Sequence, residues 1–412
     1  MTGLSLAGYT FEMPKTNCLC KIDPVGQLYA SYHGRKSPNI FNITIHLKES
    51  INTEVLQVAL DDLVKRLPFL NIKLKRGFFK YYHKTCTKPL KCEEERCGCE
   101  ERFLHTGKRD NAFKVFYGER HLTLEAVHSV CDGRGMVKIA SALLVRYFEL
   151  QGIVVDKTCV IDCEHAFDAE ETENAFERYG NNNTHSPKRS LFIEKAYQSE
   201  GEKTAQIKTH RFELDKLKNR AKKYNATVNE YVLACIFKAV ADERMGLGCE
   251  KPISALIPID CRNFLESKTL CNFVTAVPVT MPETEEFGEM IEGLRQQFKK
   301  FDVGFILSDI TALHKGLRKI RFMPRIFKKQ IFKAVDGMYG KGLSLMFSNI
   351  GLVKLPKEIE SKVEMIDFVL GCNPKVPHII TCISAGNILS LTVKSIVKGD
   401  IFEKIFANAT TL

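Results

Sequence analysis

The 412-residue sequence has no long apolar run, and none of its runs approaches the ~18 residues that a membrane-spanning helix requires. Residues 1–8 contain no basic residue, and Glu12 and Pro14 soon follow, so the sequence predicts no signal peptide. Fifteen cysteines, an odd number spread along the chain, favour reduced thiols and a cytoplasmic location. With 44% apolar and 26% charged residues, the expectation is an ordinary soluble globular protein.

Other absences limit the kinds of ligand that the sequence leads us to expect. No repeat of fixed period is visible, and no nucleic-acid-binding module accompanies the net charge of +11, so we expect no nucleic acid partner. Residues 78–82 predict a strand, and Cys86, Cys92, Cys97 and Cys99 follow it without the Cys-x2-Cys spacing of most structural zinc sites. We expect reduced thiols in a loop there, with neither metal nor cofactor bound; a zinc site is the alternative.

The stretch 122–135 changes pattern in its middle. Residues 122–127 alternate between apolar and other side chains, which predicts a strand with one apolar face. The strand runs into His128, and Gly133 and Gly135 then permit a tight turn before a helical pattern begins. A rigid strand end beside an open loop is a common place for chemistry. By its spacing alone, however, His128 is more typical of a structural histidine than of a catalytic one.

His128, Asp132 and Gly133 together form the unbroken sequence His-x-x-x-Asp-Gly. This motif resembles the signature of acyltransferases with the chloramphenicol acetyltransferase-like fold. That superfamily includes peptide-synthetase condensation domains, plant BAHD acyltransferases and bacterial alcohol acetyltransferase-like proteins, and the likeness is greatest to the last group. Two later stretches resemble the superfamily in the expected order, namely Pro258-x-Asp260-x-Arg262 with Asn272-Phe273, and Ser348-Asn349-x-Gly351.

The resemblance covers the chain from about residue 40 to its end. It implies an α/β fold of two pseudo-symmetric lobes, each a layer of helices on a mixed sheet, with an active-site tunnel between them. We expect the N-terminal lobe at 1–165 and the C-terminal lobe at 206–412. The acidic and polar stretch 166–205 is then a crossover linker, whose charges form a solvated face.

The resemblance also implies an activity: transfer of an acyl group from an acyl thioester to an alcohol or amine acceptor, with an alcohol preferred. Acyl-coenzyme A would be the co-substrate, and an acyl carrier protein is the other donor considered. His128 would be the general base, because an imidazole with a pKa near 6.5 is largely neutral in a cytoplasm. Asp132 belongs to the same motif, but the family salt-bridges it to an arginine, here Arg262, so that both residues fix the loop.

Substrate contacts are implied at three residues. Gly133 would let the acyl chain or the thioester pass close to the backbone. Either an amide of the glycine loop or the Ser348 hydroxyl would stabilise the oxyanion, and Asn349 is expected beside it. Both Ser348 and Asn349 could instead simply cap the end of a strand. Cys131 invites a thiol-nucleophile mechanism but has no separate base partner.

Residues 315–333 mix Lys and Arg with large apolar residues, and Pro324 splits them into two helical pieces. They could form a core-facing helix pair whose charges face water. Their cations could also meet the phosphates of coenzyme A, the acidic face of a carrier protein, or anionic lipid in a peripheral membrane contact. For the whole chain, a carrier-fed condensation-type enzyme and a catalytically silent two-lobed scaffold are the alternatives to an acyltransferase.

Overall fold

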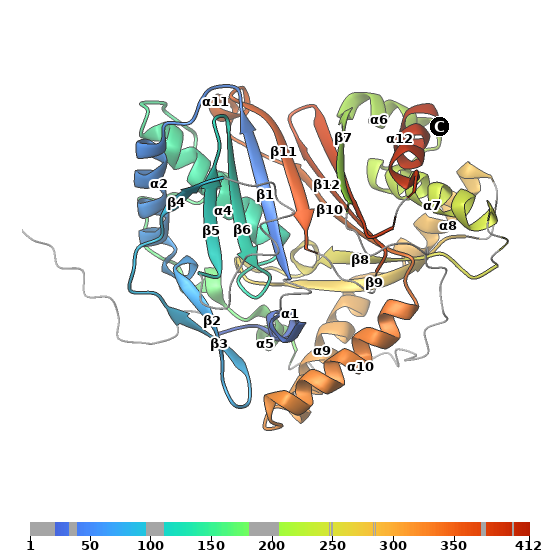
Figure 1. Ribbon diagram of the computed structural model, residues 1–412, viewed down its shortest axis with the longest axis horizontal. Coiled ribbons are helices and arrows are strands. Elements are labelled where there is room, and N and C mark those ends of the chain that lie inside the picture. Colours follow the sequence, from blue (N-terminus) through green and yellow to red (C-terminus); the bar gives the residue numbers. More distant parts are fainter. Residues whose placement is uncertain are drawn as a thin grey trace, which may run out of the picture.

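The computed structural model describes residues 21–32, 39–95, 111–180 and 206–412, apart from residues 247, 249, 283, 285, 372–375 and 398 and the side chains of Tyr32 and of 335–341. The chain forms two α/β lobes, each built on its own sheet with its own hydrophobic core, which confirms the expected fold class (Figure 1). In this described part of the chain, no helix is long and apolar enough to cross a bilayer.

The first sheet has five strands in the order β11-β1-β6-β5-β4. Two helices, α2 and α4, share its core through buried leucines and other apolar residues on their inner faces. These elements are β1 (Ile40–Leu47), α2 (Thr53–Arg66), β4 (Cys92–Glu94), β5 (Phe113–Tyr117), β6 (His121–Val127), α4 (Gly133–Glu149) and β11 (Val363–Leu370).

The second sheet has six strands in the order β7-β13-β12-β10-β8-β9. Its strands are β7 (Gln206–Glu213), β8 (Ser254–Asp260), β9 (Val274–Thr280), β10 (Leu345–Val353), β12 (His378–Ala385) and β13 (Ile388–Ser395), and its helices are α6 (Leu214–Lys223), α7 (Val228–Gly246), α8 (Phe287–Phe298) and α12 (Ile401–Thr411). A capping box begins α7, because the amide of Thr227 donates to Oε2 of Glu230 at 2.8 Å and the amide of Glu230 donates to Oγ1 of Thr227 at 3.2 Å.

One strand joins the two halves of the sequence. β11 comes from the second half but pairs antiparallel with β1, from Phe41 opposite Leu370 to Leu47 opposite Val363. The first sheet is therefore complete only with a segment from near the end of the chain. The lobe boundaries at 165 and 206 stay a prediction, and residues 181–205 of the expected linker lie outside the described residues.

A third group of elements lies at one end of the molecule (Figure 1). It consists of α1 (Pro24–Tyr32), the hairpin β2 (Ile72–Arg76) and β3 (Tyr81–Thr85), α5 (Ala175–Tyr179), α9 (Val303–Lys319) and α10 (Arg325–Lys341). The strand predicted at residues 78–82 is wrong in its first half, because the amide of Gly77 donates to the carbonyl of Lys80 at 2.9 Å and makes this the hairpin turn. The remaining short helices are η1 (Pro68–Leu70), η2 (Ala169–Thr172), η3 (Cys261–Asn263) and α11 (Lys357–Glu360).

Candidate active site

His128 lies directly after β6, which is an interior strand of the first sheet, between β1 and β5. Its amide donates to the carbonyl of Asn39, just before β1, at 2.9 Å. The amide of Val130 donates to the carbonyl of Val127 at 2.9 Å, which closes a tight turn, and α4 begins at Gly133. As the sequence predicts, the stretch 122–135 runs from a strand through a turn into the first residues of a helix.

The imidazole of His128 is oriented by Asn272. Its Nδ1 lies 3.0 Å from Oδ1 of Asn272. The amide group of Asn272 can face only one way, because its Nδ2 donates to Oδ2 of Asp23 at 2.9 Å and to the backbone carbonyl of His128 at 3.0 Å. An oxygen facing Nδ1 requires a proton on Nδ1, so the neutral ring carries its lone pair on Nε2.

Asp23 supports this arrangement from α1. It is 2% exposed and directly precedes Pro24, the first residue of α1. Its Oδ1 accepts the amide of Gly26 at 2.7 Å, as a helix-capping carboxylate does. Burial raises the pKa of Asp23 to about 6, although the bonds from Gly26 and Asn272 lower it. The buried carboxyl group therefore orders both the start of α1 and the amide that faces His128.

Two aromatic rings cover His128. The ring of Tyr29 in α1 stacks on the imidazole with its centroid 4.0 Å away and an angle of 18° between the planes, and Phe41 of β1 lies at 4.8 Å. Burial lowers the pKa of His128, while Asp132 and Asn272 raise it, and the net shift is downward. The lowered pKa favours the neutral imidazole, which is the form that can accept a proton.

Both carboxylate oxygens of Asp132 are engaged away from the imidazole. Oδ1 accepts the amide of Gly135 at 2.8 Å and caps α4. Oδ2 accepts the amide of Phe273 at 2.8 Å and Nη1 of Arg262 at 2.9 Å. The structure thus brings together the expected partners Asp132 and Arg262. The described contacts of Asp132 are those of a residue that holds a loop in place.

Arg262, in η3, has every guanidinium nitrogen occupied. Besides Asp132, its Nη1 donates to Oδ1 of Asp260 at 2.9 Å, its Nε to the carbonyl of Thr269 at 3.0 Å and its Nη2 to the carbonyl of Cys271 at 2.7 Å. Burial alone would lower the pKa of Arg262, but the two aspartates raise it well above its usual value. Arg262 therefore ties the His128 loop of the first half to β8 of the second half.

Gly133 of the motif and Gly135, two residues after it, differ in the space around them. A Cβ on Gly133 would lie 3.0 Å from the end of the Ile350 side chain in β10. A Cβ on Gly135 would lie 2.0 Å from the carbonyl oxygen of Leu270, a backbone atom that cannot move aside. Gly135 is therefore required by packing. The expected role of Gly133 toward an acyl chain or thioester stays a prediction, and Ile350 is its neighbour here.

Ser348 and Asn349 lie in β10 at a bulge, where the register against β12 shifts between Asn349 and Gly351. Oδ1 of Asn349 accepts the amide of Gly351 at 2.8 Å, and its Nδ2 donates to Oδ1 of Asn229 in α7 at 2.9 Å. Asn349 thus shapes the bulge. Ser348 is partly exposed one position before it. Through the contact of Ile350 with Gly133, this bulge lies beside the first turn of α4.

Cys131 offers no competing nucleophile. Cys131 is fully buried, and burial raises the pKa of its thiol well above its usual value, so it stays protonated. Cys97 and Cys99 lie outside the described residues. Within the residues that are described, no group of three or more His, Cys, Asp or Glu side chains is placed to hold a metal ion.

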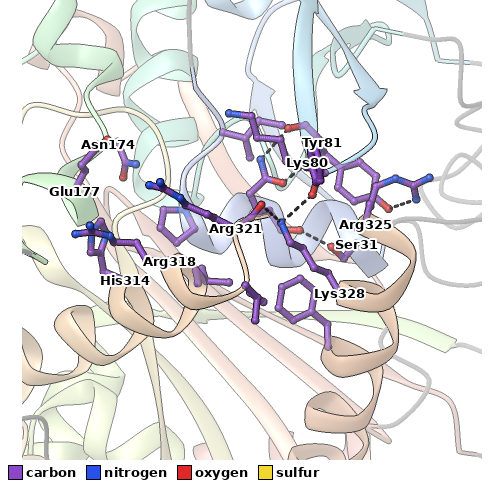
Figure 2. Close-up of a pocket in the computed structure, with 17 residues that line it drawn as sticks. Ser31, Lys80, Tyr81, Asn174, Glu177, His314, Arg318, Arg321, Arg325 and Lys328 are labelled. Atoms are coloured by element: carbon purple, nitrogen blue, oxygen red, sulfur yellow. Dashed lines mark hydrogen bonds between the residues drawn. The ribbon is translucent and has the colours of Figure 1, made fainter. Parts of the chain in front are cut away.

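Residues 315–333 contribute to a pocket beside α1. The pocket has a volume of about 240 Å³ and lies between α1, the β2–β3 hairpin, α5, α9 and α10 (Figure 2). The side of α1 that carries Gln27 and Ser31 lines it, so α1 separates the pocket from the Asp23 and Tyr29 contacts to the His128 site. The tunnel expected between the lobes stays a prediction.

The sequence did not reveal Asp23 and Tyr29 as parts of this site. An Asp before a Pro is a helix-start signal, and it marks Asp23 as a cap, although not as a partner of Asn272. Asn272 belongs to the second matching stretch, but its spacing does not indicate that it meets His128. Contacts between residues 144 positions apart depend on the fold, which local pattern does not encode.

No protein-family model matches the chain, and no curated protein sequence matches it. Solved structures match over almost all of it. A trichothecene 15-O-acetyltransferase from Fusarium sporotrichioides matches with a TM-score of 0.64 and 12% identity, covering 95% of this chain and 94% of the other. A Fusarium sporotrichioides protein complexed with coenzyme A and T-2 matches with a TM-score of 0.61 and 11% identity, covering 93% and 96%.

The first condensation domain of the CDA synthetase matches with a TM-score of 0.60 and 13% identity, covering 93% of this chain and 92% of that domain. At such low identity, these matches establish the fold. The chain thus has the two-lobed fold shared by acetyltransferases and peptide-synthetase condensation domains, the chloramphenicol acetyltransferase-like fold.

Proposed function

We propose that the protein is an acyltransferase that moves an acyl group from an acyl thioester to a hydroxyl or amine of a small acceptor, with His128 as general base. One observation carries the proposal. The contact of Asn272 Oδ1 with Nδ1 of His128 favours the tautomer whose lone pair is on Nε2, and burial lowers the pKa of the ring so that its neutral form is favoured. The fold, shared with acetyltransferases, supports the reaction class.

In this reaction Nε2 of His128 takes the proton of the acceptor hydroxyl while its oxygen attacks the carbonyl carbon of the thioester. The resulting tetrahedral intermediate carries a negative oxygen, for which the Ser348 hydroxyl and an amide of the glycine loop are the candidate donors. The carbon–sulfur bond then breaks, and the imidazolium returns its proton to the leaving thiolate. Oδ1 of Asn272 stabilises the imidazolium by accepting the bond from Nδ1.

Acyl-coenzyme A is the proposed donor, and the structure solved with coenzyme A supports it. An alcohol is the proposed acceptor, because the matching acetyltransferase acts on oxygen. The second candidate is a condensation-type enzyme fed by a carrier protein, which the match to a condensation domain favours. With either donor, His128 would act next to the carbonyl carbon of a thioester.

Release of free thiol from acetyl-coenzyme A, with a panel of alcohols and amines as acceptors, tests the proposal. The wild type should release thiol only when an acceptor is present, and His128→Ala should lose about 10²–10⁴-fold in turnover. His165→Ala is the matched control, because its side chain is 78% exposed and its ion pair with Asp162, at 3.8 Å, is long. Its turnover should equal that of the wild type.

Three outcomes would contradict this proposal or favour one of its alternatives. Wild-type turnover in His128→Ala would contradict the assignment of the base. Failure to bind coenzyme A, measured by calorimetry, together with binding of an acylated carrier protein, would favour the condensation-type enzyme. Binding of neither donor would leave a two-lobed scaffold.

A further inference from the structure

Two segments of the chain hold its surplus positive charge. The hairpin, residues 72–85, contains five Lys and Arg, residues 315–333 contain eight, and neither segment contains Asp or Glu. Without these thirteen, the chain has 47 Lys and Arg against 49 Asp and Glu. The net charge of +11 is therefore local to the hairpin and the junction of α9 and α10.

The same segments expose large apolar side chains. Phe78 is 72% exposed, Phe322 70% and Phe327 62%. Counted over the described residues, seven of the thirteen exposed large apolar side chains lie here, the other four being Phe79, Tyr82, Ile326 and Ile331. The interpretation of residues 315–333 as a helix pair with its apolar side chains facing the core is thus wrong for four residues of that segment, which are Phe322, Ile326, Phe327 and Ile331. Exposed apolar side chains gathered in one place indicate a binding surface.

The two segments form one surface. The amide of Arg325 donates to the carbonyl of Phe78 at 2.8 Å, and its Nε donates to the carbonyl of Gly77 at 3.2 Å. Nζ of Lys328 donates to the carbonyl of Phe79 at 2.9 Å. Figure 1 shows the hairpin tip and the α9–α10 junction at the same end of the molecule. Residues 77–82 and 318–331 are called the basic aromatic surface below.

The pocket beside α1 opens among the cations of this surface (Figure 2). Its lining includes Lys80, Arg318, Arg321, Arg325 and Lys328. In the part of the chain that the structure describes, none of these five cations is paired with a carboxylate, and the one carboxylate that lines the pocket belongs to Glu177. Such a group of cations favours an anion with several oxygen acceptors, such as a phosphate ester.

Burial and the neighbouring cation also act on Lys328. Burial lowers the pKa of Lys328, and the charge of Lys80 lowers it further. A phosphate between these groups would offset the repulsion. The cations of the pocket therefore match the charged headgroup of a lipid, and the exposed rings around the pocket match the apolar region that begins below the headgroups.

We propose that the basic aromatic surface docks the protein on a bilayer that contains anionic lipid. The Phe side chains enter the boundary between headgroups and acyl chains, the cations contact lipid phosphates, and the pocket holds one headgroup phosphate. A bilayer is favoured over an acidic carrier protein because the apolar side chains project from the tips of the hairpin and the helix junction. A planar bilayer can accept such projecting rings without a matching groove.

Co-sedimentation with vesicles tests this proposal without any measurement of turnover. The wild type should bind vesicles of phosphatidylcholine mixed with phosphatidylglycerol, bind phosphatidylcholine alone at least ~10-fold more weakly, and dissociate as salt is raised. Phe322→Ser with Phe327→Ser, and separately Arg318→Ser with Arg321→Ser, should each weaken binding by about 10-fold or more.

Two control variants replace exposed apolar or basic residues elsewhere on the molecule. Val154→Ser alters a side chain that is 90% exposed, and Lys222→Ser with Lys223→Ser removes two exposed cations from α6. Both should bind vesicles as the wild type does. All variants should melt at the wild-type temperature, since the altered side chains are exposed, and retained melting shows that lost binding is a surface effect.

Four results would overturn the proposal. Equal binding to neutral and anionic vesicles would show that the cations do not contribute to binding. Wild-type binding by both surface variants would show that the basic aromatic surface is not the binding site. Binding to an acidic carrier protein with no binding to vesicles, lost in the same variants, would make this a protein-docking surface. Displacement of the protein from vesicles by low millimolar inorganic phosphate, unlike an equal ionic strength of chloride, would instead assign the pocket to a free phosphate ligand.

Discussion

Asn272 contacts His128 twice, through Nδ1 of the ring at 3.0 Å and through the backbone carbonyl at 3.0 Å. One side chain from the second half of the sequence therefore fixes both the tautomer of the imidazole and the loop that carries it. Asp23 fixes the amide of Asn272 in turn, at 2.9 Å. Proton transfer at Nε2 thus depends on three segments that are far apart in the sequence.

Replacement of Asn272 tests this dependence. Asn272→Ala lets the imidazole populate both tautomers, so turnover should fall by up to about 10²-fold, the lower end of what a positioned base contributes. KM for the donor should change little. The nitrogen-15 NMR shifts of His128 should report a mixture of tautomers. Asn408→Ala, which loses a bond to the carbonyl of Cys235 far from the site, is the control and should keep wild-type turnover.

The pH dependence of turnover follows from the lowered pKa of His128. Only the neutral imidazole accepts a proton, so turnover should be lost as pH falls through that pKa and should rise to a plateau above it. Because burial lowers the pKa, the rise should occur below about pH 6.5, the usual value for histidine, and the plateau should be reached by neutral pH. A profile of kcat/KM against pH measures this. A rate that declined from acid to neutral pH would contradict a histidine base.

Asp132→Ala should damage folding more than chemistry. Removal of the carboxylate leaves Arg262 buried with one partner fewer and also removes the cap of α4, so the free energy of unfolding should fall by about 3–5 kcal/mol. Urea denaturation measures the change. Lys216→Ala breaks an exposed pair with Glu213 and should cost under about 0.5 kcal/mol. Unchanged stability with complete loss of turnover would instead place Asp132 in the chemistry.

Gly133 and Gly135 should respond differently to replacement by alanine. Gly135→Ala drives a methyl group into the carbonyl of Leu270 and should lower the free energy of unfolding by about 3 kcal/mol or more. Gly133→Ala meets only the movable end of Ile350 and should cost under about 1.5 kcal/mol. Thermal melts of both variants, compared with the wild type, test the difference. An equal loss in the two would show that backbone freedom and not space sets the need for glycine.

Local pattern in the sequence predicts the local features of this structure. The alternation before His128, the turn after it and the Pro324 break between α9 and α10 all follow from spacing and backbone preference. The Asp132 and Arg262 contact follows from resemblance. Local pattern misplaces the strand at residues 78–82, because Phe and Tyr favour strands and Gly77 alone marks the turn.

Long-range contacts were not predictable in the same way. Nothing near Asp23 or Tyr29 in the sequence indicates that α1 covers His128, because the contact depends on how α1 packs against β3, α9 and α10. The exposed rings of Phe78 and Phe322 likewise have the pattern of core residues in the sequence. Only the fold reveals that they lie on the surface.

The pairing of β11 with β1 has a consequence for the order in which the chain is made. A ribosome completes β1, β5 and β6 long before it reaches Val363–Leu370, so β1 has an open edge for most of translation. An unpaired strand edge can join the wrong partner, including a second nascent chain. A truncated product that ends before residue 363 therefore lacks not only the last strands of the second lobe but also the edge that closes the first.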